Sequence, residues 1–311
     1  MEEKFSYDKY IELLHNARGE FDSTPYTYVE KFIPNMLYKY MSIESVENGK
    51  EMREKRLKAL REEKIWASHA NILNDPFELK IFNYDLDNRY VREFNHEVMK
   101  AHEIISLSSS PYDKLMWSHY ANSHSGICLE FQFEVRGEPI FPVEYYEISK
   151  REDVTSIIEN WMKTKQAVLK GTLSTFDVRC IVAEIMRICF RKEKIWNYEQ
   201  EYRILTRNHE AIDNEEYEKY LCEKGSCHKM EDVGLRLTSI ILGLNCSEED
   251  EKDLNELIEI INENRLEAVL SQDKMYDRAR MKSVMRDNDE FVKLKRIEID
   301  ENDLSLVILE V

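Results

Sequence analysis

The stretch LTSIILGLNCSEEDEKDLNELIEIINENR, residues 237–265, contains both kinds of element from which this chain is built. Residues 237–243 are a short apolar run, typical of a buried strand. Apolar residues recur at helical spacing over 247–265, and Ser247 with Asp250 resembles a capping pattern at the start of that segment. The acidic residues behind Ser247 suit the positive end of a helix dipole. The stretch therefore predicts a strand followed by a capped helix.

Outward from this stretch, strands and helices do not alternate regularly. We expect further strands at 36–42, 104–110, 127–133, 140–146, 267–271, 292–299 and 304–310. We expect further helices at 7–18, 49–64, 90–103, 111–126 and 213–224, and two within 153–192. Such a mixture is typical of an α+β fold.

No linker rich in Gly, Pro or Ser divides the chain, so residues 1–311 are expected to form a single α+β domain. Within it we expect an N-terminal helical extension at 1–35, a core at 36–250, and a C-terminal helix and strands at 251–311.

The composition limits the class of protein. The chain has 311 residues, with 61 Asp and Glu against 44 Lys and Arg, which gives a formal charge of −17. This charge repels nucleic acid at long range. The opening MEEKFSYDKY lacks the basic and apolar regions of a signal peptide, six cysteines are scattered, and no apolar run approaches the roughly 20 residues that cross a bilayer. We expect a cytoplasmic protein with reduced thiols and no membrane partner.

The stretch WNYEQEYR, residues 196–203, raises the question of function. In an extended strand, alternate residues share a face, so Glu199, Glu201 and Arg203 are expected on one side. This pattern has two interpretations. It is either an ordinary solvated strand face that carries a Glu/Arg pair, or the polar edge of a binding site.

Several common sites are absent from the sequence. It contains neither G-x-G-x-x-G nor G-x-x-x-x-G-K-[ST], so dinucleotide-binding Rossmann and P-loop folds are excluded. Cys222, Cys227 and His228 have no second ligand pair, whereas a structural zinc site needs four ligands. We therefore predict no metal site of this kind.

Three polar and aromatic clusters lie next to predicted strands. They are Tyr38-Lys39-Tyr40, Trp117-Ser118-His119-Tyr120, and the Glu199–Arg203 segment. Each cluster alone is compatible with ordinary core or surface residues. Three such clusters at strand ends are better explained together, by a cleft.

The same segments carry a resemblance to a known family. The runs LYKYMS (37–42), LNDPFE (73–78), ISLSSSPYDKLMWSHYANSHSGICLEF (105–131), WNYEQEYR and SIILGLNCSEED (239–250) resemble the bacterial family called domain of unknown function 2971. The resemblance covers roughly residues 36–250. The family is in turn similar to ADP-ribosyltransferase folds, which implies split sheets that form a cleft, with helical insertions, and NAD bound in that cleft.

The resemblance implies roles for particular residues. Glu201 is the carboxylate that accepts a hydrogen bond from the ribose, and Glu199 is the residue on the acceptor side. Tyr120 or Trp117 is the platform on which the nicotinamide ring stacks. Arg203 holds the two glutamates or reaches a phosphate.

The first cluster departs from the family pattern. Relatives read LYHYTS where this chain reads LYKYMS, so Lys39, between Tyr38 and Tyr40, replaces the histidine that contacts the adenosine-side ribose. A lysine donates hydrogen bonds or pairs with a pyrophosphate, but it does not accept as a neutral imidazole does. The departure changes the contact expected on the adenosine side of NAD.

These observations lead to three hypotheses. The first is an NAD-consuming enzyme that transfers ADP-ribose to a macromolecular acceptor, either a protein or a nucleic acid, or hydrolyses NAD, as an intracellular toxin or phage-defence effector. The second is a nucleotide-sensing module without catalysis that regulates a partner protein, which Lys39 favours. The third is a metal-dependent nuclease built on Asp75, Glu78, Glu199 and Glu201.

Overall fold

A computed structural model describes residues 3–19, 22–43, 49–69, 73, 82–83, 85, 87–94, 102–134, 140–147, 152–173, 175–206, 224–272 and 277–311. The chain divides into two compact units, each assembled from three segments. Unit 1 comprises 1–33, 66–106 and 139–226, and unit 2 comprises 34–65, 107–138 and 227–311. Each unit is described by itself. The prediction of a single domain with boundaries at 35 and 250 stays a prediction.

The chain is an α+β protein, as predicted. Ten of the described strands are linked by backbone hydrogen bonds into a mixed sheet, with parallel and antiparallel neighbours. Three of these strands contain a boundary between the units, namely β2 (Lys64–His69), β4 (Glu103–Ser108) and β11 (Gly225–Lys229).

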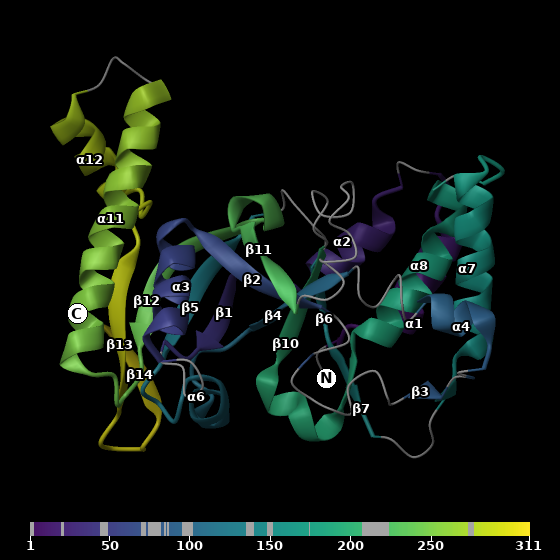
Figure 1. The fold of residues 1–311 in the computed structure, drawn as a ribbon, viewed down its shortest axis with the longest axis horizontal. Helices are drawn as coiled ribbons and strands as arrows, with labels where there is room; N and C mark the ends of the chain where they lie inside the picture. Colours follow the sequence, from purple (N-terminus) through teal and green to yellow (C-terminus); the bar gives the residue numbers. More distant parts are fainter. Residues whose placement is uncertain are drawn as a thin grey trace. The chain divides into compact units, whose positions relative to one another are not determined.

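Unit 2 is built around a run of neighbouring strands (Figure 1). These are β1 (Met36–Met41), β5 (Ile127–Phe133), β12 (Leu235–Leu242), β13 (Lys293–Ile299) and β14 (Leu306–Glu310). β12 pairs antiparallel with β5 and parallel with β13, while β14 closes the run by pairing with β13. The strands expected at 36–42, 127–133, 237–243, 292–299 and 304–310 are confirmed.

Helices α11 (Glu248–Gln272), α3 (Gly49–Arg61) and α12 (Arg278–Asp287) also belong to unit 2, and α11 packs against α3, α12 and β13 (Figure 1). The expected cap is present, because the Asp250 amide donates to Ser247 Oγ at 3.1 Å. The strand expected at 267–271 is wrong, since α11 continues through these residues. Val269 and Leu270 pack against Met281 and Met285 of α12, so tertiary packing extends the helix.

Helix α6 (Lys114–Tyr120) of unit 2 is shorter than the helix expected at 111–126. Asp113 caps its start by accepting from the amides of Leu115 and Met116. The helix ends before Asn122, Ser123 and His124, which all have positive φ. This left-handed turn leads to Gly126, where a Cβ would lie 2.5 Å from the Met41 carbonyl oxygen.

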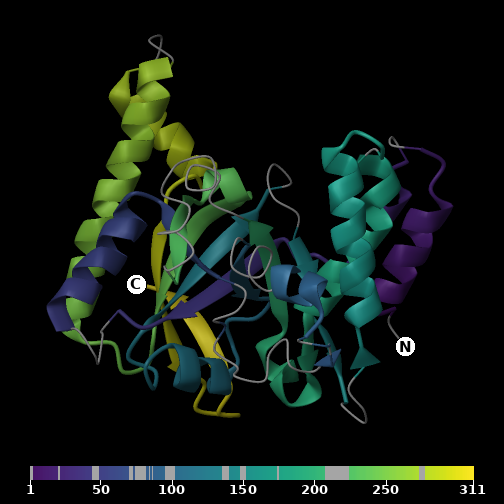
Figure 2. The ribbon, with the colours of Figure 1, turned by 45° about the vertical axis from the view of Figure 1, so that its right-hand side comes forward.

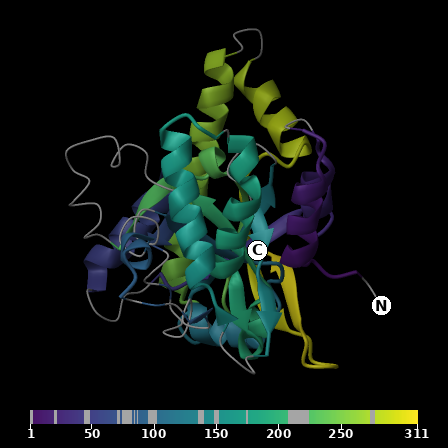
Figure 3. The same cartoon turned by 90° about the vertical axis from the view of Figure 1, so that its right-hand side faces the viewer.

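Unit 1 contains the helices α1 (Tyr7–Asn16), α2 (Thr24–Glu30), α4 (Arg89–Glu93), α7 (Thr155–Leu169) and α8 (Thr175–Cys189). α8 lies beside both α1 and α7 (Figures 2 and 3). Their apolar faces form one core around Phe141, whose ring is 5.4 Å from that of Tyr10 and 6.1 Å from those of Tyr7 and Phe190. The two helices predicted within 153–192 are confirmed.

The strands of unit 1 are short. They are β6 (Ile140–Pro142), β7 (Glu144–Tyr146), β9 (Arg191–Glu193), β10 (Glu201–Thr206), and the two-residue pair β3 (Phe82–Asn83) and β8 (Glu152–Asp153). β10 pairs with β6 and β4, and β7 pairs parallel with β9. The expected strand at 140–146 is therefore two short strands. The helix expected at 213–224 lies outside the described residues.

None of the helices in the described part of the chain is long and apolar enough to cross a membrane.

Candidate functional site

The segment WNYEQEYR is not one continuous strand. Residues Lys194–Glu199 form a 3₁₀ helix, η3, and β10 begins only at Glu201. Between them Gln200 has the left-handed backbone angles φ +45° and ψ +51°. The expectation of Glu199, Glu201 and Arg203 on one strand face is therefore wrong for Glu199. Glu201 and Arg203 alone are i and i+2 on a strand.

The two glutamates nevertheless meet at a lysine. Lys192 of β9 places Nζ 2.6 Å from Glu199 Oε2 and 3.4 Å from Glu201 Oε2. All three side chains belong to unit 1 and are nearly or fully buried, with Glu199 3% and Glu201 5% exposed. Lys192 Nζ also lies over the Trp196 ring, 5.1 Å from the ring centroid, which is a cation–π distance.

Arg203 completes the cluster. Its Nε donates to Glu201 Oε1 at 2.8 Å and its Nη2 to Glu201 Oε2 at 3.0 Å, which is bidentate pairing. Nη1 donates to the Cys189 carbonyl at 2.6 Å, and Arg203 is fully buried. Two carboxylates thus face one ammonium and one guanidinium. We call Lys192, Glu199, Glu201 and Arg203 the carboxylate cluster.

The electrostatics of the cluster follow from burial and from its own charges. Burial raises the pKa of Glu201, and repulsion from Glu199 adds to this, so the value lies above its usual range despite the attraction of Lys192. Burial alone would lower the pKa of Lys192, but Glu201 and Glu199 hold it above its usual value. Lys192 therefore stays charged at neutral pH.

Two neighbours fix Glu201 further. Its backbone amide donates to the Tyr145 hydroxyl at 2.9 Å, and a hydrogen bond from Ser106 lowers the pKa of its carboxyl. With Lys192, Ser106 and two nitrogens of Arg203 as donors, Glu201 receives about as many hydrogen bonds as the roughly four that a carboxylate accepts.

The described residues do not support the metal site of the nuclease hypothesis. No group of three or more His, Cys, Asp or Glu residues within them is arranged to hold a metal ion. Asp75 and Glu78 lie outside the described residues.

Tyr38, Lys39 and Tyr40 lie on β1, in unit 2. Tyr38 and Tyr40 share a face, opposite Glu130 and Cys128 of β5, and Lys39 lies on the other face. The Tyr40 hydroxyl donates to the Ser110 carbonyl at 2.8 Å. All three side chains lie at the middle of a paired strand, and Tyr38 and Lys39 are partly exposed.

Trp117 and Tyr120 lie on α6, also in unit 2. Trp117 is fully buried, its Nε1 donates to the Pro111 carbonyl at 2.8 Å, and its ring meets that of Tyr40 edge to face at 5.2 Å. Trp117 is thus a core residue whose ring is covered by protein atoms. Tyr120 retains exposed surface, so it is the better of the two candidates for a stacking platform.

The structure brings the predicted site residues together in two groups. Glu199, Glu201 and Arg203 converge within unit 1, and Tyr40 contacts Trp117 within unit 2. The cleft expected to join Lys39, Tyr120 and Glu201 stays a prediction.

Sequence reasoning missed Lys192, Tyr145 and Ser106 in unit 1. It also missed Glu130 in unit 2, whose Oε2 lies 2.6 Å from Lys295 Nζ and which accepts from Tyr38 at 3.4 Å. Lys192 belongs to the charged run RKEK (191–194), in which no sequence pattern distinguishes a buried lysine from an exposed one. Glu130 had a weak signal, as the one charged residue of the apolar strand ICLEFQF.

Comparison with protein-family models matches residues 116–204 to the family described as Protein of unknown function (DUF2971). The matched range begins within α6 and ends within β10. It contains the whole carboxylate cluster, but it is narrower than the expected 36–250. No curated protein and no solved structure matches the chain. The similarity to ADP-ribosyltransferase folds therefore stays a prediction.

Proposed function

We propose that this chain is an NAD-consuming, ADP-ribosyltransferase-like enzyme in which Glu201 serves the ribose and Glu199 the acceptor. One observation carries the proposal. The two carboxylates of a Glu-x-Glu sequence converge on a single ammonium, that of Lys192, within the matched range 116–204. The acceptor is a macromolecule, which fits an intracellular toxin or phage-defence effector.

The chemistry explains the need for such a pair. Cleavage of the nicotinamide glycosidic bond develops positive charge on the ribose, and a carboxylate stabilises that charge while it binds the 2′-hydroxyl. A second carboxylate orients or deprotonates the acceptor. In the proposed fold, split sheets form the NAD cleft, and Glu201 and Glu199 serve the reaction there.

Catalysis in this proposal requires a rearrangement at Glu201. Its carboxylate is buried and already receives hydrogen bonds from Lys192, Ser106 and Arg203. A ribose hydroxyl therefore has to replace one of these donors. The contact of Lys192, at 3.4 Å, is longer than those of the two Arg203 nitrogens, at 2.8 and 3.0 Å, and Lys192 also has Glu199 as a partner. We propose that Lys192 moves toward Glu199 when NAD binds.

The same burial favours a second candidate function, a nucleotide-sensing module that binds without turnover and regulates a partner protein. A cluster in which each carboxylate is neutralised by a buried cation holds a structure together without further chemistry. Lys39 in place of the family histidine also favours this candidate, since it changes the contact to the adenosine side.

The deciding experiment measures nicotinamide release and label transfer from labelled NAD, in the presence of cell extracts, for the wild type and Glu201→Gln. Glutamine keeps the shape of the side chain but removes its charge. If Glu201 stabilises the ribose cation, we expect the rate of nicotinamide release to fall by about 100-fold or more. Calorimetry with NAD on both proteins reports binding separately from turnover.

Glu144→Gln is the matched control. Glu144 pairs with Arg191 at 2.5 Å in the same unit but is not part of the carboxylate cluster, so this variant should keep the wild-type rate. The enzyme proposal fails if the wild type neither releases nicotinamide nor transfers label in any extract, or if Glu201→Gln is as active as the wild type. NAD binding without turnover would support the sensing module instead.

A further inference from the structure

Gln200 is the residue at which the chain turns between the two carboxylates of the cluster. It has the left-handed backbone angles φ +45° and ψ +51°, which a residue with a Cβ adopts only at a cost in free energy. Its amide donates to the Asn197 carbonyl at 3.3 Å, which closes the end of η3, and β10 begins directly after it. One exposed residue thus changes the direction of the chain between Glu199 and Glu201.

Both neighbours of Gln200 are fixed by other parts of unit 1. Glu199 is the last residue of η3 and its side chain is buried. The amide of Glu201 donates to the Tyr145 hydroxyl at 2.9 Å, and its carbonyl accepts from the Val143 amide at 2.8 Å. The change of direction between the two glutamates therefore falls on the backbone of Gln200.

This turn decides where the two carboxylates lie. In a continuous strand, residues i and i+2 are about 6 to 7 Å apart and their side chains run parallel on one face. Here Glu199 Oε2 and Glu201 Oε2 lie 2.6 Å and 3.4 Å from the same atom, Lys192 Nζ, so the side chains converge. An extended backbone at position 200 would restore the parallel arrangement and take Glu199 away from Lys192.

We propose that Gln200 is a positioning residue, whose left-handed backbone holds the Glu199 carboxylate against Lys192 and so sets the spacing of the carboxylate pair. It acts through Glu199. The part of the proposal that concerns catalysis rests on the proposed function, in which Glu199 serves the acceptor and Glu201 the ribose. An altered backbone at position 200 should reduce transfer to the acceptor more than cleavage of NAD, because Glu201 keeps its own contacts with Tyr145 and Arg203.

Four substitutions separate the backbone of Gln200 from its side chain. Glycine adopts left-handed angles freely, and asparagine adopts them more readily than most residues, so Gln200→Gly and Gln200→Asn should keep the wild-type geometry. Gln200→Val introduces a β-branched side chain, for which left-handed angles are least favourable. Gln200→Ala lacks the branch and is the milder variant.

The first readout does not require NAD. A lysine ammonium group that is held between two buried carboxylates exchanges its protons slowly with water, and NMR spectroscopy follows that exchange. The signal of Lys192 is the one that disappears in Lys192→Arg. We expect its protons to exchange at least about tenfold faster in Gln200→Val than in the wild type, at an intermediate rate in Gln200→Ala, and at the wild-type rate in Gln200→Gly and Gln200→Asn.

The second readout uses labelled NAD. We expect Gln200→Val to reduce label transfer in cell extracts by about tenfold or more, and nicotinamide release in buffer alone by less than about threefold. Gln200→Gly should keep both rates. When it is combined with Glu199→Gln, Gln200→Val should add less than about a twofold further loss of transfer, because two residues that act through one contact are not additive.

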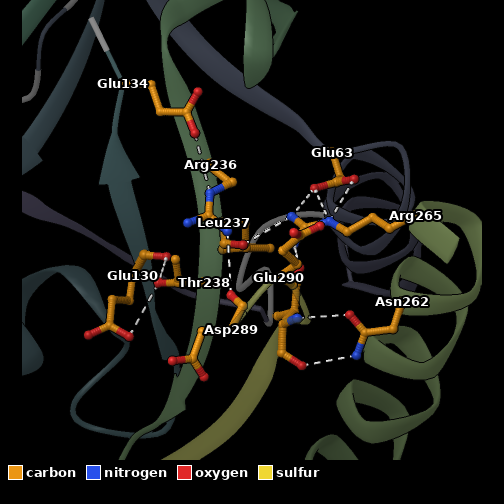
Figure 4. Close-up of polar contacts among 11 residues, drawn as sticks. Glu63, Glu130, Glu134, Arg236, Leu237, Thr238, Asn262, Arg265, Asp289 and Glu290 are labelled. Carbon is orange, nitrogen blue, oxygen red and sulfur yellow. Dashed lines mark hydrogen bonds and ion pairs between the residues drawn. The ribbon is translucent and has the colours of Figure 1, made fainter. Parts of the chain in front are cut away.

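Leu304→Val is the matched control. Leu304 is also left-handed, with φ +59°, and exposed, but it belongs to unit 2. Glu63 of unit 2 is left-handed as well, but its carboxylate pairs with Arg265, so Glu63→Val would also remove an ion pair (Figure 4). Leu304→Val and Gln200→Val should lower Tm by similar amounts, about 2 to 4 °C. Only Gln200→Val should change the exchange of Lys192 or the transfer of label.

Three results would overturn the proposal. They are wild-type exchange of the Lys192 ammonium in folded Gln200→Val, equally fast exchange in Gln200→Val and Gln200→Gly, and a loss of transfer that adds fully to that of Glu199→Gln. If Gln200→Val does not fold, Gln200→Ala decides by the same criteria. If the wild type does not act on NAD, the proposed function fails, while the exchange rates still decide whether Gln200 positions Glu199.

Discussion

At the residue scale, two glutamates in different units have similar surroundings. Glu201 lies in unit 1 beside Lys192 and Arg203, and Glu130 lies in unit 2 beside Lys295 and Thr238. Both are buried, and a buried charge is tolerated only when it is paired and hydrogen-bonded. The difference is the second carboxylate: Glu199 repels Glu201, whereas Lys295, Ser239 and Thr238 all lower the pKa of Glu130.

Glu130 provides a prediction about pH. Burial acts to raise the pKa of its carboxyl, but Lys295 and hydrogen bonds from Ser239 and Thr238 lower the value below its usual range. A carboxyl whose pKa is lowered by folding stabilises the protein above its unfolded pKa of about 4.3 and loses this effect as pH falls through the folded value. Glu130→Gln should therefore lower the free energy of unfolding at pH 7 by about 1 to 3 kcal/mol, and the difference should shrink as the pH falls below about 4.3.

Urea unfolding of wild type and variant across this pH range measures the difference. Glu301→Gln, at an exposed position in the turn before β14, is the control and should follow the wild type at each pH. A difference that stays constant from pH 7 to pH 3 would show that the charge of Glu130 is not what stabilises unit 2.

At the element scale, the start of α11 shows how local sequence sets a boundary. Ser247 Oγ accepts from the Asp250 amide at 3.1 Å and donates to Asp250 Oδ2 at 2.7 Å, and Asp250 in turn pairs with Arg53 of α3 at 2.7 Å. The cap therefore also fixes the carboxylate that connects the two helices. The end of α11, in contrast, depends on contacts with α12. Local sequence does not contain these contacts, so it predicted a strand at 267–271 instead.

The cap leads to a prediction about stability. Ser247→Ala removes the acceptor for the Asp250 amide, so we expect the free energy of unfolding to fall by about 1 kcal/mol. Ser271→Ala, near the other end of the same helix and exposed, is the control and should change it by less than about 0.5 kcal/mol. Equal effects of the two substitutions in urea unfolding would exclude a special role for the cap.

At the scale of the whole molecule, each unit consists of three separated segments of the chain. Unit 2 can complete its sheet only when β1 and β5 meet β12, which follows more than a hundred residues later. β12 is bonded on both sides and almost entirely buried, whereas β14 pairs with β13 alone among the described strands and has exposed residues such as Leu309. Stability should therefore be uneven within this sheet.

Hydrogen exchange checks this expectation. The amides of β12 should exchange at least about tenfold more slowly than those of β14, because opening an edge strand breaks one ladder and exposes little apolar surface. Both strands belong to unit 2 and are measured in the same sample, so each is the control for the other. Equal rates in β12 and β14 would mean that the sheet opens as one cooperative unit.

The sequence by itself determined the α+β class, most strands of unit 2, the two central helices of unit 1 and the cap of α11. Apolar period and capping residues act over a few neighbouring positions, so they can be read locally. Only the tertiary structure decided that Glu199 comes from a 3₁₀ helix, that Lys192 bridges it to Glu201, and that Trp117 is core. A buried charge is stable only when another element supplies its partner. The spacing of residues along the chain predicts neither that partner nor the burial.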